Sequence, residues 1–192
     1  MGEADPTAPL SPQECRDPTL EDVVKLCRAL NEAGAHYVVV GGFAIRAAGF
    51  SRTTSDIDLL VETGPENEAR VIQGLMSLPD QAVREIKPGE VEEYGVVRVA
   101  DEILVDLMRS GCDVRYADAR PDASVVEVDG VPIPFASPLT LWKMKQTHRE
   151  KDIPDRLFLR QLLAAQGIQV EEAPRPAQPT GLRAWLQRTF GS

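Results

Sequence analysis

Two carboxylates separated by one residue are the sharpest chemical feature of this 192-residue sequence. Asp56 and Asp58 open an otherwise apolar run, DIDLLV. Side chains alternate along a strand, so both carboxylates point to one face while Ile57, Leu59 and Val61 point to the other. Two adjacent negative charges favour a divalent cation between them, and an all-oxygen ligand set favours Mg²⁺ or Mn²⁺ over zinc. The alternative is that the pair ends a strand and faces solvent.

A third carboxylate, Asp106, is the only charge in residues 103–108, an apolar run that predicts a buried strand. A carboxylate in such a run needs a partner, because an unpaired buried charge is strongly unfavourable. Asp106 therefore either joins Asp56 and Asp58 at a metal ion or forms a salt bridge with Arg98 on the preceding strand.

Gly41 and Gly42 lie where a β-branched run gives way to a short helical stretch. Glycine leaves backbone N–H groups open to a ligand, and the positive end of a helix favours an anion, which suits a triphosphate. The loop that precedes Asp56 holds three more groups able to contact phosphate oxygens: Arg52, Thr53 and Thr54. The structural alternatives are a tight turn for the glycine pair and solvation for the loop.

The first half of the chain predicts the elements that position these groups. In order, they are a helix over 19–34, a strand over 36–40, a short helix over 43–48, a strand over 56–61 and a helix that begins at Pro65. Thr19 and Asp22 form a capping-box pattern at the first helix, and Gly34 ends it. Residues 36–40 offer no polar face, so we expect this strand in the middle of a sheet.

The second half predicts two hairpins and two helices. The hairpins pair residues 94–99 with 103–108 and residues 124–128 with 131–135, and the helices cover 139–148 and 154–165. Asp129-Gly130 is the strongest turn signal, and Pro132 and Pro134 predict that the last strand is a sheet edge. The fold class is therefore α/β (α+β), with a small mixed, twisted sheet flanked by helices and a C-terminal helical segment.

The expected organisation is one folded domain between two tails. A disordered leader (1–17) precedes the core (18–136), which continues into a helical cap of the same domain (137–168). A linker (169–180) then leads to an amphipathic tail helix (181–192), whose apolar stripe comprises Leu182, Trp185, Leu186 and Phe190. We expect this stripe to dock on a protein partner or on a second copy of the chain.

Composition narrows the class of protein. Thirty acidic against 21 basic residues give a net charge of −9, which argues against extended, sequence-independent binding to DNA. Cys15, Cys27 and Cys112 are widely spaced and predict neither a disulfide framework nor a zinc site. The acidic, proline-rich N-terminus is unlike a signal peptide, and no apolar run is long enough to span a bilayer, so we expect a cytoplasmic protein.

Taken together, GGFAIRAAGFSRTTSDIDLLV and the later Asp106 resemble the signature of the nucleotidyltransferase superfamily, which has the DNA polymerase β-like fold. The order is a glycine pair, a short helix and loop, Asp-apolar-Asp, and a third aspartate on a later strand. Residues 138–162 resemble the helical segment of minimal nucleotidyltransferases related to abortive-infection toxins. Five residues carry this second resemblance: Lys145, Arg149, Lys151, Asp152 and Asp155.

The resemblance implies a two-metal mechanism. Asp56 and Asp58 would ligate both Mg²⁺ ions and Asp106 the catalytic one, while Lys143 or Lys145 would neutralise phosphate. The implied reaction moves a nucleoside monophosphate from an NTP to an acceptor hydroxyl on RNA or tRNA, a protein or a small molecule, with release of pyrophosphate. The rival interpretation is a catalytically silent binding module of the same fold, such as a toxin-antitoxin component.

Overall fold

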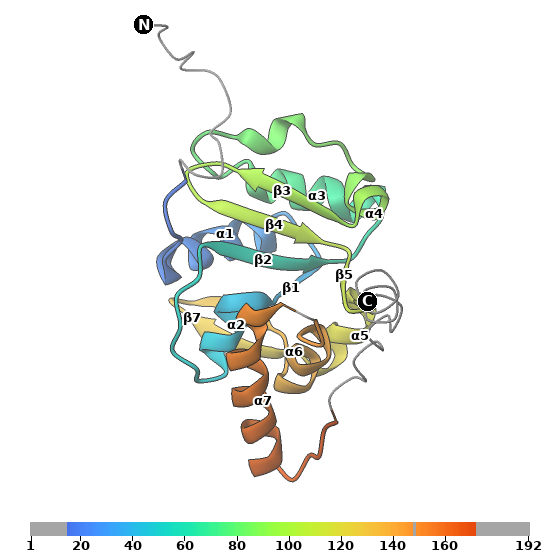
Figure 1. Cartoon of the computed structure of the whole chain (residues 1–192). Coiled ribbons are helices and arrows are strands. Elements are labelled where there is room, and N and C mark those ends of the chain that lie inside the picture. The colour runs from blue at the N-terminus through green and yellow to red at the C-terminus, as the bar shows by residue number, and fades with distance from the viewer. Residues whose placement is uncertain (1–14, 148, 172–192) are drawn as a thin grey trace, which may run out of the picture.

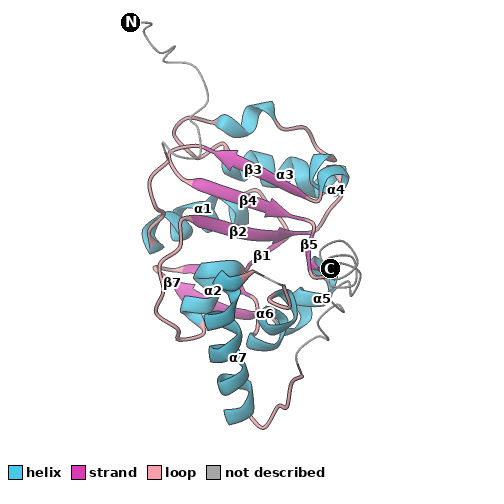
Figure 2. Cartoon of the chain, in the orientation of Figure 1, coloured by secondary structure: helices cyan, strands magenta, loops and turns pink. Residues whose placement is uncertain are grey.

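The structure is a computed structural model that describes residues 15–147 and 149–171. Figures 1 and 2 show its helices and strands. The first half of the chain contains α1 (Leu20–Glu32), β1 (Tyr37–Val39), α2 (Gly41–Ala47), β2 (Asp56–Val61), α3 (Pro65–Leu75), η1 (Ala82–Glu85) and α4 (Glu90–Tyr94). The second half contains β3 (Val96–Ala100), β4 (Leu104–Met108), β5 (Ser110–Gly111), β6 (Val114–Arg115), α5 (Tyr116–Ala119), η2 (Arg120–Asp122), β7 (Ser124–Val128), β8 (Val131–Phe135), α6 (Pro138–Met144), η3 (Glu150–Asp152) and α7 (Ile153–Ala165).

One six-stranded mixed sheet organises the molecule, with the strand order β3-β4-β2-β1-β8-β7. β2 pairs parallel with β4 and antiparallel with β1, which itself pairs parallel with β8. β1 and β2 occupy the middle of the sheet because their apolar side chains are buried by helices on both faces. The predicted fold class, a mixed α/β sheet flanked by helices with a helical segment after it, is confirmed.

Helices cover the two faces of the sheet in separate layers. α1 and α3 pack against each other behind the sheet in Figure 1, while α6 contacts both α2 and α7 in front of it. The predicted capping box starts α1: the Asp22 N–H donates to Thr19 Oγ1 at 3.3 Å, and the Thr19 N–H donates to Asp22 Oδ2 at 2.7 Å. Apolar side chains from both layers join one core with the central strands.

The position of β8 corrects the sequence prediction. Pro132 and Pro134 predict an edge strand, but β8 lies between β7 and β1. The two-residue turn sets a register in which both prolines occupy positions whose backbone groups point away from β7. The Pro132 carbonyl instead accepts a hydrogen bond from Asn31 Nδ2 at 2.9 Å. β1 meets β8 only where Val39 pairs with Phe135, beyond the prolines. The missing N–H groups therefore remove no bond from either ladder.

Two boundaries also differ from the prediction. Tyr94 ends α4, a helix that the sequence pattern did not indicate, so β3 starts at Val96. α6 ends at Met144, earlier than the expected residue 148. Residues 1–14 of the expected leader, 172–180 of the expected linker and the whole expected tail helix lie outside the described residues. Within the described chain, no helix has the length and apolar character needed to cross a membrane.

Candidate active site

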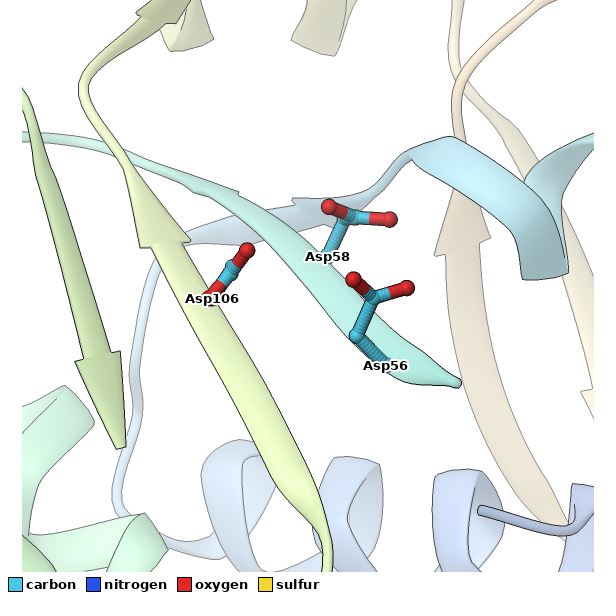
Figure 3. A group of neighbouring side chains, drawn as sticks. All are labelled: Asp56, Asp58 and Asp106. Atoms are coloured by element: carbon cyan, nitrogen blue, oxygen red, sulfur yellow. The ribbon is translucent and has the colours of Figure 1, made fainter. Parts of the chain in front are cut away.

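An acidic cluster lies on neighbouring strands of the sheet. β2 and β4 run parallel in a register that places Asp58 directly beside Asp106, and Asp56 is two residues before Asp58 on the same face. One carboxylate oxygen from each aspartate lies within 4.8 Å of the others. Figure 3 shows the three side chains converging. Such a group of oxygens could hold a divalent cation.

The negative charges of the cluster are not fully balanced by nearby cations. Burial and, after it, the neighbouring charges of Asp56 and Asp106 raise the pKa of Asp58 to about 6. The positive charge of Lys145 and the N–H group of Gly42 act against the rise without cancelling it. A cation between the carboxylates would relieve both the burial penalty and the repulsion.

Asp106 also forms the salt bridge that was the alternative interpretation of this residue. Arg98 Nε donates to Asp106 Oδ1 and Arg98 Nη2 donates to Asp106 Oδ2, both at 2.7 Å. The arginine side chain is about half exposed (48%), whereas Asp106 is buried. An ionised carboxylate accepts at about four lone-pair sites, so the arginine fork leaves positions for another ligand. Ion pairing and metal ligation by Asp106 are therefore compatible.

The glycine pair is shaped by close contact with this cluster. Gly41 has φ +59°, and a Cβ there would lie 1.8 Å from Asp58 Oδ2. A Cβ on Gly42 would lie 2.3 Å from Oγ1 of the buried Thr54. Both positions require glycine because the start of α2 packs directly against β2 and the loop before it. The turn therefore brings bare backbone next to Asp58.

A cavity of about 360 Å³ opens over the acidic cluster. This volume is within the range of small-molecule sites. Its charged and glycine lining consists of Gly41, Gly42, Arg52, Asp56, Asp58, Arg98, Asp106, Gly111, Lys145, Arg149, Lys151 and Asp152. Its apolar lining includes Val40, Val96, Met108, Leu141 and Met144. Four of the charged side chains, Arg52, Lys145, Arg149 and Lys151, form what we call the basic wall. The cavity thus offers basic side chains to a polyanion and apolar side chains to an apolar group.

The remaining predicted site residues divide between the cavity and its surroundings. Lys145 lines the cavity, whereas Lys143 is exposed and does not. Thr54 also stays out of the lining, but its Oγ1 lies 3.2 Å from Asp56 Oδ1 and so helps to orient that carboxylate. Thr53 is exposed, and its carbonyl accepts a bond from Arg52 Nε at 3.1 Å.

Asp152, Arg149 and Lys151 carry the second resemblance in the sequence, but the sequence pattern indicates no role in the site for any of them. The structure brings all three to the cavity because the chain between α6 and α7 folds over it. The spacing of these residues from Lys145 was the sequence signal for a shared site. It could be interpreted only once the path of the chain between α6 and α7 was known.

Structure comparison finds similar folds at low sequence identity. An antigenic nucleotidyltransferase-like protein from Paracoccidioides brasiliensis is 18% identical over 95% of this chain and 91% of its own, with a TM-score of 0.46. ANT(2″)-Ia in complex with adenylyl-2″-tobramycin is 18% identical over 76% and 89%, with a TM-score of 0.47. The solution structure of the antibiotic-resistance factor ANT(2″)-Ia is 17% identical over 88% and 91%, with a TM-score of 0.48.

These values assign neither a family nor an activity to the chain. A scan against protein-family models finds no match, and a search of curated proteins finds none either. The functional interpretation therefore depends on the residues and geometry of the site.

Proposed function

We propose that this chain is a metal-dependent nucleotidyltransferase that moves a nucleoside monophosphate from an NTP to an acceptor hydroxyl and releases pyrophosphate. The observation that carries the proposal is the convergence of Asp56, Asp58 and Asp106 at a cavity that is also lined by basic side chains. Carboxylates that hold metal ions and cations that receive phosphates are the two requirements of this reaction.

The donor set fits Mg²⁺ or Mn²⁺. All three groups are carboxylates, their oxygens lie within 4.8 Å, and the pKa of Asp58 is raised by burial and by its acidic neighbours. Asp56 and Asp58 would hold the ions that accompany the nucleotide, and Asp106 would complete the site of the ion nearest the acceptor. When bound, such ions neutralise the charge that develops on the phosphoryl oxygens during transfer.

The chain's own groups bind and orient the reactants. Lys145 and Arg52 contact the triphosphate oxygens from the basic wall, and the backbone at Gly41 and Gly42 allows the phosphates to approach Asp58. The acceptor oxygen then forms a bond to the α-phosphorus while the bond between that phosphorus and the α,β-bridging oxygen breaks. Pyrophosphate leaves with the electron pair of the broken bond, and Asp106 draws the proton of the acceptor hydroxyl.

The proposal extends to the organisation of the chain and to its acceptor. The core (18–136) supplies the carboxylates and the cap (137–168) supplies Lys145, so both act as one domain in the cytoplasm. The acceptor is a hydroxyl of RNA or tRNA, a protein or a small molecule. Arg149 and Lys151 at the cavity make an anionic acceptor compatible with a net charge of −9.

One observation favours a second candidate, a silent binding module such as a toxin-antitoxin component. Arg98 already neutralises Asp106 through two bonds of 2.7 Å, as a structural carboxylate would require. In such a module the cavity would bind a nucleotide or a partner without transferring anything.

Incubation of the purified chain with labelled NTPs, Mg²⁺ and cell extract tests the two candidates. The enzyme proposal predicts label on a defined macromolecule or metabolite, dependent on Mg²⁺ and absent with Asp56→Asn. Binding of Mg²⁺-NTP in calorimetry without labelling of any acceptor would support the silent module. Absence of both binding and labelling would exclude the nucleotide site.

A further inference from the structure

A buried network of charges lies directly behind the basic wall of the cavity. Lys145 Nζ is 2.8 Å from Asp152 Oδ1 and 3.0 Å from Asp155 Oδ2. Arg52 Nη1 donates to the same Asp155 oxygen at 2.6 Å. Thr147 Oγ1 donates to Asp152 Oδ2. Asp152 and Asp155 are only 2% and 1% exposed, so the two carboxylates are essentially sealed from water.

The network joins parts of the chain that are far apart in sequence. Arg52 comes from the loop before β2, Lys145 follows α6, and Asp155 lies in the first turn of α7. The start of a helix stabilises a carboxylate there. Asp155 is the only one of the two acids that contacts both cations, since Asp152 pairs with Lys145 but has no bond to Arg52 among the described contacts.

Stability alone is a weak reason to bury such a cluster. The desolvation of buried ion pairs offsets most of their attraction, and apolar side chains of similar volume often serve as well. The cations here are more accessible than the acids: the side chains of Lys145 and Arg52 are 15% and 28% exposed, against 3% and 1% for Asp152 and Asp155, and both cations line the cavity. Each therefore contacts a buried carboxylate on one side and the ligand space on the other.

The bonds that are already used leave donors free for a ligand. An ammonium group has three N–H donors, and the two carboxylates take two from Lys145. Burial lowers the pKa of Lys145, but the hydrogen bonds to Asp152 and Asp155 outweigh it, so the pKa stays above its ordinary value. Lys145 thus remains charged, with its side chain fixed and a donor left at the cavity.

We infer that Asp155, supported by Asp152, is a positioning residue that fixes Lys145 and Arg52 as a paired receptor for the triphosphate. The inference depends on the proposed nucleotide site and adds the residues that pre-organise it. Without Asp155, two long, flexible side chains would have to be ordered by the ligand itself, and this ordering would weaken binding.

Asp155→Asn tests the inference, because it keeps the side-chain volume and removes the charge. The matched control is Asp101→Asn: Asp101 is also fully buried (0% exposed) and accepts backbone bonds from Asp80, Ala82 and Glu102, but it does not line the cavity. Both variants should lose stability, so unfolding does not distinguish them. Affinity for Mg²⁺-tripolyphosphate does, because this probe carries the phosphate chain without a base.

Calorimetry should show that Asp155→Asn weakens tripolyphosphate binding about tenfold to hundredfold, the effect of a lost charge-assisted contact. Asp101→Asn should bind as the wild type does, and both variants should keep wild-type Mn²⁺ affinity in an electron paramagnetic resonance titration. Equal tripolyphosphate affinity in Asp155→Asn and wild type would overturn the positioning role. Failure of the wild type to bind tripolyphosphate would instead reject the proposed nucleotide site.

Asp152→Asn provides a second test if Asp155→Asn does not fold. Asp155 would still hold Lys145 and Arg52 in this variant, so the expected loss is smaller, about threefold to tenfold. Combining either variant with Lys145→Gln should give less than the sum of the two effects, because the acids act through the lysine. Fully additive effects would show that the two acids do not act through Lys145.

Discussion

Gly41→Ala should disturb the metal site through a single methyl group. The new Cβ would lie 1.8 Å from Asp58 Oδ2 and 2.5 Å from Asp58 Cγ, far inside any possible contact distance. Asp58 must therefore rotate or shift, and it cannot keep its place beside Asp56 and Asp106. We expect weaker Mn²⁺ binding together with lower stability.

Gly34→Ala separates this collision from backbone strain. Gly34 has φ +68°, close to the +59° of Gly41, but a Cβ there meets nothing within 4 Å. Both variants should lose about 1–2 kcal/mol because a non-glycine residue takes the left-handed conformation. Gly41→Ala should lose a further 1–3 kcal/mol, roughly the effect of forcing an extra methyl into a packed site.

Two measurements complete this prediction. Urea unfolding monitored by circular dichroism gives the free energies, and paramagnetic resonance gives the Mn²⁺ affinities. Gly41→Ala should bind Mn²⁺ about tenfold to hundredfold more weakly, the usual range when a metal ligand loses its orientation. Gly34→Ala should bind normally. Equal stability and equal Mn²⁺ affinity in the two variants would refute the packing of Gly41 on Asp58.

Three other changes should affect the glycine turn, the acidic cluster and the C-terminal stripe. Gly42→Val should weaken NTP binding in calorimetry and should also lower the melting temperature, since its Cβ would lie 2.3 Å from Oγ1 of the buried Thr54. A normal melting temperature would show that Gly42 does not pack on Thr54. Without metal, the free energy of unfolding should fall by about 2 kcal/mol as pH rises from 4 to 6, because burial raises the pKa of Asp58 from 3.8 to about 6 and the folded state keeps a proton that the unfolded chain loses. Asp58→Asn should flatten this slope in urea titrations. Removal of residues 172–192 should change the oligomeric state or expose apolar surface, and unchanged sedimentation and melting would show that the stripe has no partner.

Local patterns were sufficient to predict the centre of the fold. The alternation in DIDLLV matched β2 residue for residue, and Asp129-Gly130 fixed the register of the last hairpin. The buried run before Gly41 correctly indicated a central strand. These features depend on side-chain period and turn geometry, which are encoded within a few neighbouring residues.

Features that depend on distant contacts could not be predicted in this way. Pro132 and Pro134 suggested an edge strand, because sequence does not show that β1 meets β8 only beyond them. The choice between Lys143 and Lys145 required the position of the cavity, which Lys145 lines and Lys143 does not. The link from Arg52 to Asp155 spans 103 residues and has no local signature.

Asp106→Asn distinguishes a metal ligand from a structural carboxylate at the third position of the acidic cluster. Asn keeps the volume and a neutral oxygen but removes the anionic ligand, while the half-exposed Arg98 can turn to solvent. Nucleotide affinity by calorimetry and transfer of labelled NMP in a single turnover should be measured on the same preparation. We expect a folded variant with near-normal Mg²⁺-NTP affinity and almost no transfer. Near-normal transfer, or unfolding of the variant, would contradict this expectation and leave Asp106 as the structural partner of Arg98.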